Sequence, residues 1–190
     1  MAEVILFHHA QGLTSGVIAF ADQLRAAGHV VHTPDLYEGQ TFASIDEGVA
    51  HAKQVGFDTI LERGRLAAEG LPGATVYGGF SLGVLPGQML AQTRPGARGA
   101  LLFHGAFPAS EFGPEWPAAV PLQIHAMVGD EWFESDREAA NELVGSAHDA
   151  ELFLYPGDRH LFADSSLPDY DAAATALLMS RVVAFLDRVA

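Results

Sequence analysis

One serine of the sequence has the neighbours that a nucleophile needs. Ser81 is the centre of Gly79-Phe80-Ser81-Leu82-Gly83, which fits the pattern G-x-S-x-G. An apolar segment precedes this pentapeptide and a helix-like segment follows it, so the serine is expected on a sharp turn from strand to helix. Such a turn strains the backbone at the serine, and the flanking glycines leave room for it. We therefore interpret Ser81 as a nucleophile rather than as an inert serine in a glycine-rich turn.

A serine hydroxyl needs a base, and the base needs an acid that orients it. Asp130 follows the apolar segment 122–128, and His160 follows the next apolar segment along the chain. The order serine, acid, histidine is the one that accompanies a nucleophile on a strand-to-helix turn. Asp130 could cap a helix and His160 could be a surface residue, but their order and placement together indicate a triad. The backbone N–H of Leu82 would then face the developing oxyanion.

The elements that must position these residues alternate along the chain. Strands are expected at 4–7, 30–31, 74–77, 99–103, 122–128 and 151–155. Helices are expected at 14–27, 44–68, 82–92, 135–144 and from near residue 168 onward. This alternation predicts an α/β fold, in which a mostly parallel sheet has helices on both faces, as a single domain over residues 1–190. Ligands bind at the carboxyl ends of such strands, where the three triad residues are expected.

Local patterns predict where some elements begin and end. Two capping-box pairs, Ser44 with Glu47 and Ser135 with Glu138, indicate helix starts. The dipeptide 78–79, Gly-Gly, is expected to end the third strand. The last helix is expected to bury a stripe made of Leu177, Leu178, Val182, Phe185 and Leu186.

The composition excludes several classes of protein. The chain has 190 residues, of which 49% are hydrophobic and 18% charged, so a disordered chain is excluded. Asp and Glu number 24 against 10 Lys and Arg, and the net charge of −14 disfavours nucleic acids and anionic membranes as partners. The absence of cysteine excludes disulfides and thiolate catalysis. No apolar run is long enough to span a membrane and the first residues do not resemble a signal peptide, so a cytoplasmic protein is expected.

Several histidines and aromatic residues also fall near expected strand ends. His8 and His9 are neighbours on a strand and point to opposite faces, so they cannot readily share a metal ion. We expect no metal and no cofactor, with His9 and His104 near the pocket and His125 in a structural role. Aromatic side chains could form the wall of an apolar pocket, and the candidates are Phe80, Phe107, Trp116, Trp132, Phe133 and Phe162.

Four segments of the chain resemble the dienelactone hydrolase family of α/β-hydrolases. They are Thr33-Pro34-Asp35-Leu36-Tyr37, the pentapeptide 79–83, His125-Ala126-Met127-Val128-Gly129-Asp130 and His160-Leu161-Phe162. The resemblance covers most of the chain. It implies a compact, lidless α/β-hydrolase that cleaves esters or lactones through an acyl-enzyme, without metal or cofactor. It also implies that the backbone N–H of Ala10 is the second oxyanion donor.

The sequence departs from the best-known members of that family at three positions. Ser81 stands in place of a cysteine, His9 in place of a glutamate, and Asp164 in place of an arginine that holds the carboxylate of the substrate. A serine hydroxyl cannot be held as an anion as a thiol can, so the loss of the glutamate is consistent with a serine mechanism. Asp164 is expected beside the pocket, where it would disfavour anionic substrates.

The resemblance implies a small-molecule ester or lactone as the substrate. The same triad could serve acyl transfer or perhydrolysis, because an acyl-enzyme accepts any suitable nucleophile. A different class also remains open at the level of sequence, a catalytically silent hydrolase-like protein that binds a small molecule. Sequence does not indicate the oligomeric state.

Overall fold

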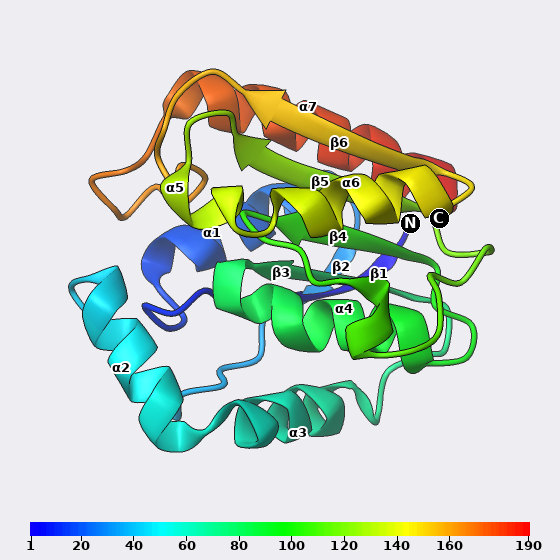
Figure 1. Cartoon of the computed structure of the whole chain (residues 1–190), viewed down its shortest axis with the longest axis horizontal. Coiled ribbons are helices and arrows are strands. Elements are labelled where there is room, and N and C mark those ends of the chain that lie inside the picture. The colour runs from blue at the N-terminus through cyan, green and yellow to red at the C-terminus, as the bar shows by residue number, and fades with distance from the viewer.

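A six-stranded parallel sheet runs through the centre of the molecule (Figure 1). The computed structural model describes residues 1–190. The strands are β1 (Glu3–Phe7), β2 (Val30–His32), β3 (Thr75–Phe80), β4 (Gly99–Phe103), β5 (Leu122–Met127) and β6 (Ala150–Tyr155). Their order is β2-β1-β3-β4-β5-β6, and every neighbouring pair is parallel. The order therefore reverses between β1 and β3, and a reversal of this kind is where α/β sheets bind ligands.

Helices cover both faces of the sheet. On one face lie α1 (Ser15–Ala26) and α7 (Ala172–Val189). The other face is covered by α2 (Ile45–Val55), α3 (Phe57–Ala68), α4 (Val84–Thr93) and α6 (Arg137–Ser146). A short helix, α5 (Glu131–Glu134), precedes α6, and single turns of 3-10 helix occupy Ser81–Gly83 and Ala109–Glu111. The predicted α/β fold class, with helices on both faces, is confirmed.

The two faces of the sheet have separate cores, and β1 contributes to both. Ile5 and Phe7 pack into the core under α3 and α4, while Val4 and Leu6 pack into the core under α1 and α7. Successive side chains of a strand point to opposite faces, so a strand buried on both faces must be apolar throughout. The continuous apolar run at the start of the sequence is explained in this way.

Several predicted boundaries are wrong, and packing explains each of them. The third strand continues through the dipeptide 78–79, because β1 and β4 pair with it on both sides. The long helix at 44–68 is two helices, since the chain turns at Gly56, where φ is 89°. Ser135 is the C-cap residue of α5, and the N-cap position of α6 is held by Asp136. Leu177 is 47% exposed and lies outside the buried stripe of α7.

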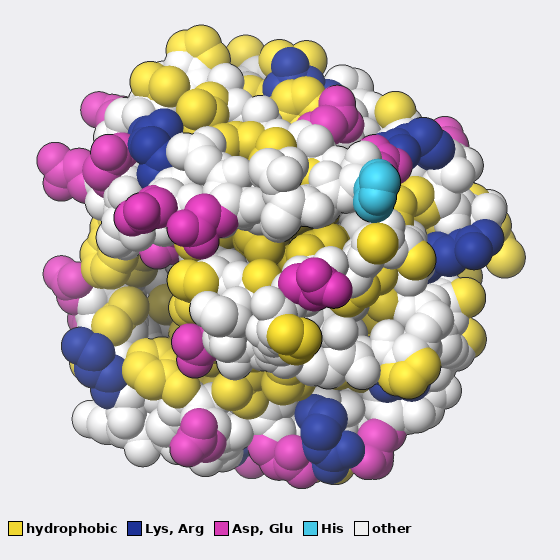
Figure 2. Space-filling model, turned by 45° about the vertical axis from the view of Figure 1, so that its right-hand side comes forward, with side chains coloured by type: hydrophobic (Ala, Val, Ile, Leu, Met, Phe, Trp, Pro, Cys, Tyr) yellow, Lys and Arg dark blue, Asp and Glu magenta, His cyan; other side chains and the backbone are white.

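The negative charge of the chain is spread over its surface. Figure 2 shows Asp and Glu side chains scattered over one face, with fewer Lys and Arg side chains between them. No helix combines the length and the apolar character needed to cross a membrane.

Candidate active site

Ser81 lies on a strained turn between β3 and α4. Its φ is 48°, a left-handed conformation that side chains other than glycine rarely adopt. The flanking glycines are required by space. A Cβ on Gly79 would lie 2.0 Å from the carbonyl oxygen of Gly83, and one on Gly83 would lie 2.5 Å from the carbonyl oxygen of Phe7. The turn therefore lifts the Ser81 hydroxyl above the carboxyl end of the sheet, as the pattern G-x-S-x-G predicts.

Ser81, His160 and Asp130 form one chain of hydrogen bonds. His160 Nε2 lies 2.8 Å from Ser81 Oγ, and His160 Nδ1 lies 2.7 Å from Asp130 Oδ2. Asp130 is 1% exposed, and its second oxygen accepts a hydrogen bond from the backbone N–H of Trp132. The carboxylate thus caps α5 with one oxygen and contacts the imidazole with the other. Because a carboxylate only accepts, the proton lies on Nδ1, and Nε2 is free to accept the proton of the serine.

The loops that carry the acid and the histidine are bound to each other. The backbone N–H of Gly129 donates to the carbonyl oxygen of Gly157 over 2.8 Å. The backbone N–H of Arg159 lies 3.3 Å from the sulfur of Met127. Gly157 has a φ of 125°, which allows the sharp turn after β6. The distance between acid and base is therefore held by backbone contacts on both sides of the pair.

Two backbone N–H groups without a partner belong to the segments around the turn. Leu82 is in the first turn of a helical segment, where N–H groups have no acceptor within the helix. Ala10 is 3% exposed, and its N–H donates to no group of the protein. The end of β1 packs directly against the turn, since a Cβ on Gly83 would also lie 2.6 Å from the carbonyl oxygen of His8. Both N–H groups thus belong to segments that flank Ser81.

The two other positions at which the sequence departs from the family pattern are in contact. His9 Nε2 lies 2.8 Å from Asp164 Oδ2, and His9 Nδ1 lies 3.2 Å from the backbone N–H of Gln11. Nδ1 therefore accepts and Nε2 donates to the carboxylate. Asp164 also accepts hydrogen bonds from the hydroxyls of Thr14 and Ser166. Both ring nitrogens of His9 are engaged, neither of them with Ser81, and the pair joins the loop after β1 to the loop that follows His160.

Asp164 is buried, but its contacts favour the charged form. Burial alone raises its pKa, whereas the hydrogen bonds from His9, Ser166 and Thr14 outweigh this effect and lower the pKa from 3.8 to about 2. A carboxyl whose pKa is lowered by folding stabilises the protein above its unfolded pKa. That stabilisation is lost as the pH falls through the folded value.

The exchange Asp164→Asn is expected to destabilise the protein by about 2 kcal/mol at neutral pH. The difference from the wild type is expected to narrow between pH 4 and pH 2, as the wild-type carboxyl takes up its proton. Urea unfolding of both proteins at several pH values measures this difference. Asp158→Asn, at an exposed carboxylate near the same loop, is the matched control and should change stability by less than about 0.5 kcal/mol. A deficit of Asp164→Asn that stays constant with pH would contradict the assignment.

A cleft of about 170 Å³ opens beside the nucleophile. Its lining consists of Ser81, Leu82, His104, Gly105, Phe107, Trp132, Ser135, Asp136 and His160. Three of the predicted pocket residues are among them, namely His104, Phe107 and Trp132. The Trp132 ring is 47% exposed and lies 5.7 Å from the His160 ring, and the His104 ring lies 5.8 Å from it on another side. The His160 imidazole thus lies near two other rings at the edge of the cleft.

The other residues predicted for the pocket do not line this cleft, and among them Phe80 and Trp116 are buried in the two cores. His9 and Asp164 are buried against each other, as described above. Phe133 is fully buried in the core on the α6 side, and Phe162 is buried behind the ring of His104 at a centroid distance of 4.9 Å. Spacing along the sequence places a residue on a loop, but it does not say whether the side chain points to the core or to the cleft.

The sequence analysis missed one charged residue of the cleft. Asp136 is half-buried in the lining, close to Ser81 and His160. Burial raises the pKa of its carboxyl, although the backbone N–H of Ala106 and the hydroxyl of Ser135 oppose this shift. Asp136 follows Ser135, at which the sequence predicts the start of a helix, and no motif distinguishes it as a functional residue.

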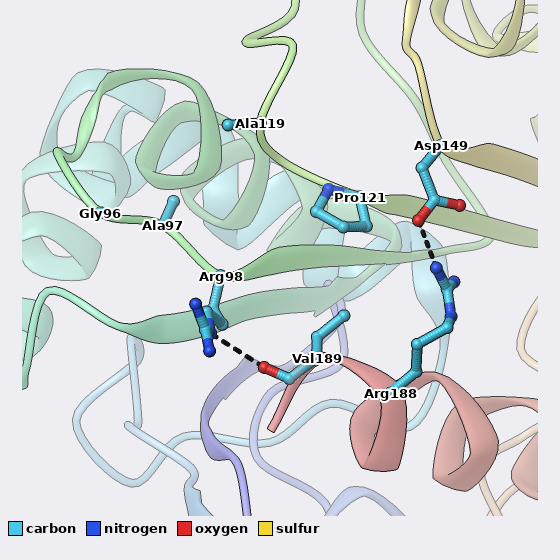
Figure 3. Close-up of a pocket in the computed structure, with 8 residues that line it drawn as sticks. All are labelled: Gly96, Ala97, Arg98, Ala119, Pro121, Asp149, Arg188 and Val189. Atoms are coloured by element: carbon cyan, nitrogen blue, oxygen red, sulfur yellow. Dashed lines mark hydrogen bonds and ion pairs between the residues drawn. The ribbon is translucent and has the colours of Figure 1, made fainter.

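A larger cleft, of about 490 Å³, lies at the opposite end of the sheet (Figure 3). It is bordered by the residues that precede β4, β5 and β6 and by the end of α7. Its arginines are engaged, because Arg98 donates to the carbonyl oxygen of Val189 and Arg188 pairs with Asp149. No nucleophile lines it, so the smaller cleft carries the candidate chemistry. No group of three or more side chains in the structure could hold a metal ion.

Comparisons with known proteins identify the fold and the family of the chain. A search of the curated proteins found no match. Among solved structures, a dienelactone hydrolase-like promiscuous phosphotriesterase from metagenomic libraries matches 100% of this chain and 87% of its own, at a TM-score of 0.75 and 18% identity. A putative dienelactone hydrolase from Klebsiella pneumoniae matches 98% of this chain and 87% of its own, at a TM-score of 0.73 and 18% identity.

An esterase from Thermogutta terrifontis, solved after reaction with paraoxon, matches 99% of this chain and 83% of its own, at a TM-score of 0.62 and 18% identity. At these identities the solved structures establish the α/β-hydrolase fold alone. The family is established by a sequence model of the dienelactone hydrolases, which matches residues 1–190. The strained serine turn, the six-stranded sheet and this match agree, and the chain belongs to the dienelactone hydrolase family.

Proposed function

We propose that this α/β-type hydrolase cleaves carboxylic esters or lactones with Ser81 as nucleophile, His160 as base and then acid, and Asp130 as the residue that orients His160. The observation that carries the proposal is the hydrogen-bond chain from Ser81 Oγ through both nitrogens of His160 to Asp130, with distances of 2.8 and 2.7 Å. A neighbouring base makes the serine hydroxyl nucleophilic at the moment of attack.

The first half of the proposed reaction forms an acyl-enzyme. Ser81 Oγ attacks the carbonyl carbon of the substrate while its proton passes to His160 Nε2. The carbonyl oxygen becomes an oxyanion, which the N–H groups of Leu82 and Ala10 stabilise. The intermediate then collapses, the bond from carbon to the leaving oxygen breaks, and His160 gives its proton to that oxygen. An ester releases an alcohol at this point, whereas a lactone keeps the new hydroxyl attached to its acyl group.

The second half of the reaction returns the enzyme to its starting state. A water molecule attacks the acyl carbon and His160 Nε2 takes one of its protons. Collapse of this second intermediate breaks the bond to Ser81 Oγ, and the proton on His160 returns to that oxygen. The acid product leaves with the oxygen of water. Asp130 keeps the imidazole in one orientation throughout and stabilises its charged form.

Covalent labelling tests the proposed nucleophile. A fluorophosphonate probe is expected to add to Ser81 of the wild type and to leave Ser81→Ala unmodified, as read by intact mass and peptide mapping. The adduct forms because the activated hydroxyl displaces fluoride at phosphorus. Ser110→Ala, at another serine of a surface segment, is the matched control and should be labelled as the wild type is. Labelling of Ser81→Ala at wild-type rate would remove Ser81 from the mechanism.

Activity measurements separate the hydrolase from the other two functions considered. A burst of p-nitrophenol from p-nitrophenyl acetate, followed by steady release, is expected of an acyl-enzyme that water resolves. A protein that only binds small molecules would give neither phase. An acyl transferase or perhydrolase would release p-nitrophenol faster when an alcohol or hydrogen peroxide is added, because that nucleophile competes with water for the acyl group.

A further inference from the structure

Asp136 is at the start of α6 but does not cap it. Aspartate is favoured before the first turn of a helix because its carboxylate accepts hydrogen bonds from free N–H groups there. The Asp136 carboxylate makes no such bond to α6. Its oxygens lie 3.3 Å from the backbone N–H of Ala106 and 3.1 Å from the hydroxyl of Ser135. The side chain therefore points away from its own helix and toward the loop after β4.

The carboxylate of Asp136 has no cationic partner. No Lys, Arg or His nitrogen lies within 4.0 Å of it, although it is half-buried. Its hydrogen bonds are also few. One is long, and the Ser135 hydroxyl lies 2.9 Å from the carbonyl oxygen of Trp132, so its single proton can go either to that oxygen or to Asp136. An unpaired carboxylate in a partly desolvated place lowers stability unless something donates to it.

Asp136 faces the same cleft as the nucleophile. A Cβ added to Gly105 would lie 3.4 Å from Asp136 Oδ2 and 3.7 Å from the carbonyl oxygen of Ser81, so the carboxylate and the nucleophile flank one residue. His104, in the same lining, is 2% exposed, and neither of its ring nitrogens has a hydrogen-bond partner. The wall beside Ser81 thus holds unsatisfied polar groups among the apolar side chains of Leu82 and Phe107.

We propose that Asp136 selects substrates with an ammonium group or another strong hydrogen-bond donor close to the scissile ester, and disfavours those with a carboxylate there. The cleft has a volume of about 170 Å³, so the group that bears the donor is short. Such a donor would satisfy the Asp136 carboxylate. A substrate carboxylate would instead be placed beside a like charge, and no arginine is in the lining of this cleft.

This inference rests on the proposed function. It assigns the selection of substrates by charge to Asp136 instead of Asp164. The sequence placed the repulsive carboxylate at Asp164, which the structure shows to be buried against His9. The cleft itself receives its negative charge from Asp136. Charge-assisted hydrogen bonds are strong in partly desolvated sites, so one such contact is sufficient to rank short substrates.

The test compares short esters of different charge. Ethyl pentanoate, ethyl 4-aminobutanoate and monoethyl succinate vary the acyl side and release the same ethanol. The acetates of 1-pentanol, 4-amino-1-butanol and glycolic acid vary the alcohol side and release the same acetate. In at least one series, the wild type is expected to give a kcat/KM for the cationic ester that exceeds that for the anionic ester by about tenfold or more, the effect of one hydrogen bond to a charged group. The comparison of these rates in the wild type tests the proposal without depending on the folding of a variant.

The variant Asp136→Asn keeps the shape of the side chain and removes its charge. It is expected to lower the cation-to-anion ratio of kcat/KM about tenfold or more. Glu138→Gln removes an equal charge from an exposed position of the same helix and is expected to keep the wild-type ratio. Equal rates for all charges in both wild-type series would overturn the proposal, and so would an unchanged ratio in Asp136→Asn. If Ser81→Ala is inactive while the charge ranking is flat, the proposed hydrolase mechanism holds and only the role of Asp136 fails.

Discussion

Replacing His160 with alanine is expected to lower kcat for ester hydrolysis by about 10⁴-fold to 10⁶-fold. Without the imidazole, Ser81 Oγ keeps its proton during attack, and the leaving oxygen has no proton donor. The oxyanion donors stay in place, so a residual rate above that of water is expected. Steady-state kinetics with p-nitrophenyl acetate measures the loss, and circular dichroism confirms that the variant is folded.

The double variant His160→Ala/Asp130→Asn separates a triad from two independent residues. Asp130 acts on the reaction through His160, so its replacement should cost little more once the histidine is gone. Asp130→Asn alone is expected to lower kcat about 10⁴-fold, because the amide favours the wrong tautomer of the imidazole. Asp158→Asn, on the loop next to His160, removes a carboxylate of similar position and should leave kcat near the wild-type value. If the two single losses multiply in the double variant, the triad assignment is wrong.

The meeting of Ser81, Asp130 and His160 could be predicted because most of its determinants are local. A strand followed by G-x-S-x-G sets the turn at Ser81 whatever the rest of the chain does. Parallel strands end at one edge of the sheet, so Asp130 and His160 at two other strand ends are brought to the same edge. The alternation of apolar and amphipathic segments predicted the sheet and its two helical layers for the same reason, since burial on both faces requires apolar strands.

The remaining features depend on contacts between distant parts of the chain. His9 and Asp164 are 155 residues apart, and only the packing of two loops shows that they satisfy each other. Asp136 occupies a position where aspartate ordinarily caps a helix, so its sequence context gave no reason to place it in the cleft. Gly79 looked like the end of a strand, but pairing of β3 with β1 and β4 continues through it. Local propensity is overruled wherever neighbours on both sides supply hydrogen bonds.

The exchange Gly83→Ala is expected to destabilise the protein by about 1–3 kcal/mol and to lower kcat about 100-fold. The φ of Gly83 is −65°, which alanine adopts readily, so the backbone conformation itself is not the obstacle. The obstacle is space, because the added Cβ would lie 2.5 Å from the carbonyl oxygen of Phe7 and 2.6 Å from that of His8. Both contacts are with backbone, which cannot rotate away as a side chain can. The end of β1 must therefore move, and it carries the Ala10 N–H with it.

Gly145→Ala is the matched control, since nothing lies within 4 Å of a Cβ at that position in α6. There the exchange is expected to stabilise the protein by about 0.5–1 kcal/mol, because alanine is the better helix former. Urea unfolding and steady-state kinetics on both variants measure the two effects together. A loss of kcat in Gly83→Ala that exceeds its loss of folded protein would show that the end of β1 contributes to the reaction through its position beside Ser81. Wild-type stability and kcat in Gly83→Ala would contradict the close packing of the serine turn against β1, and with it the place assigned to Ala10.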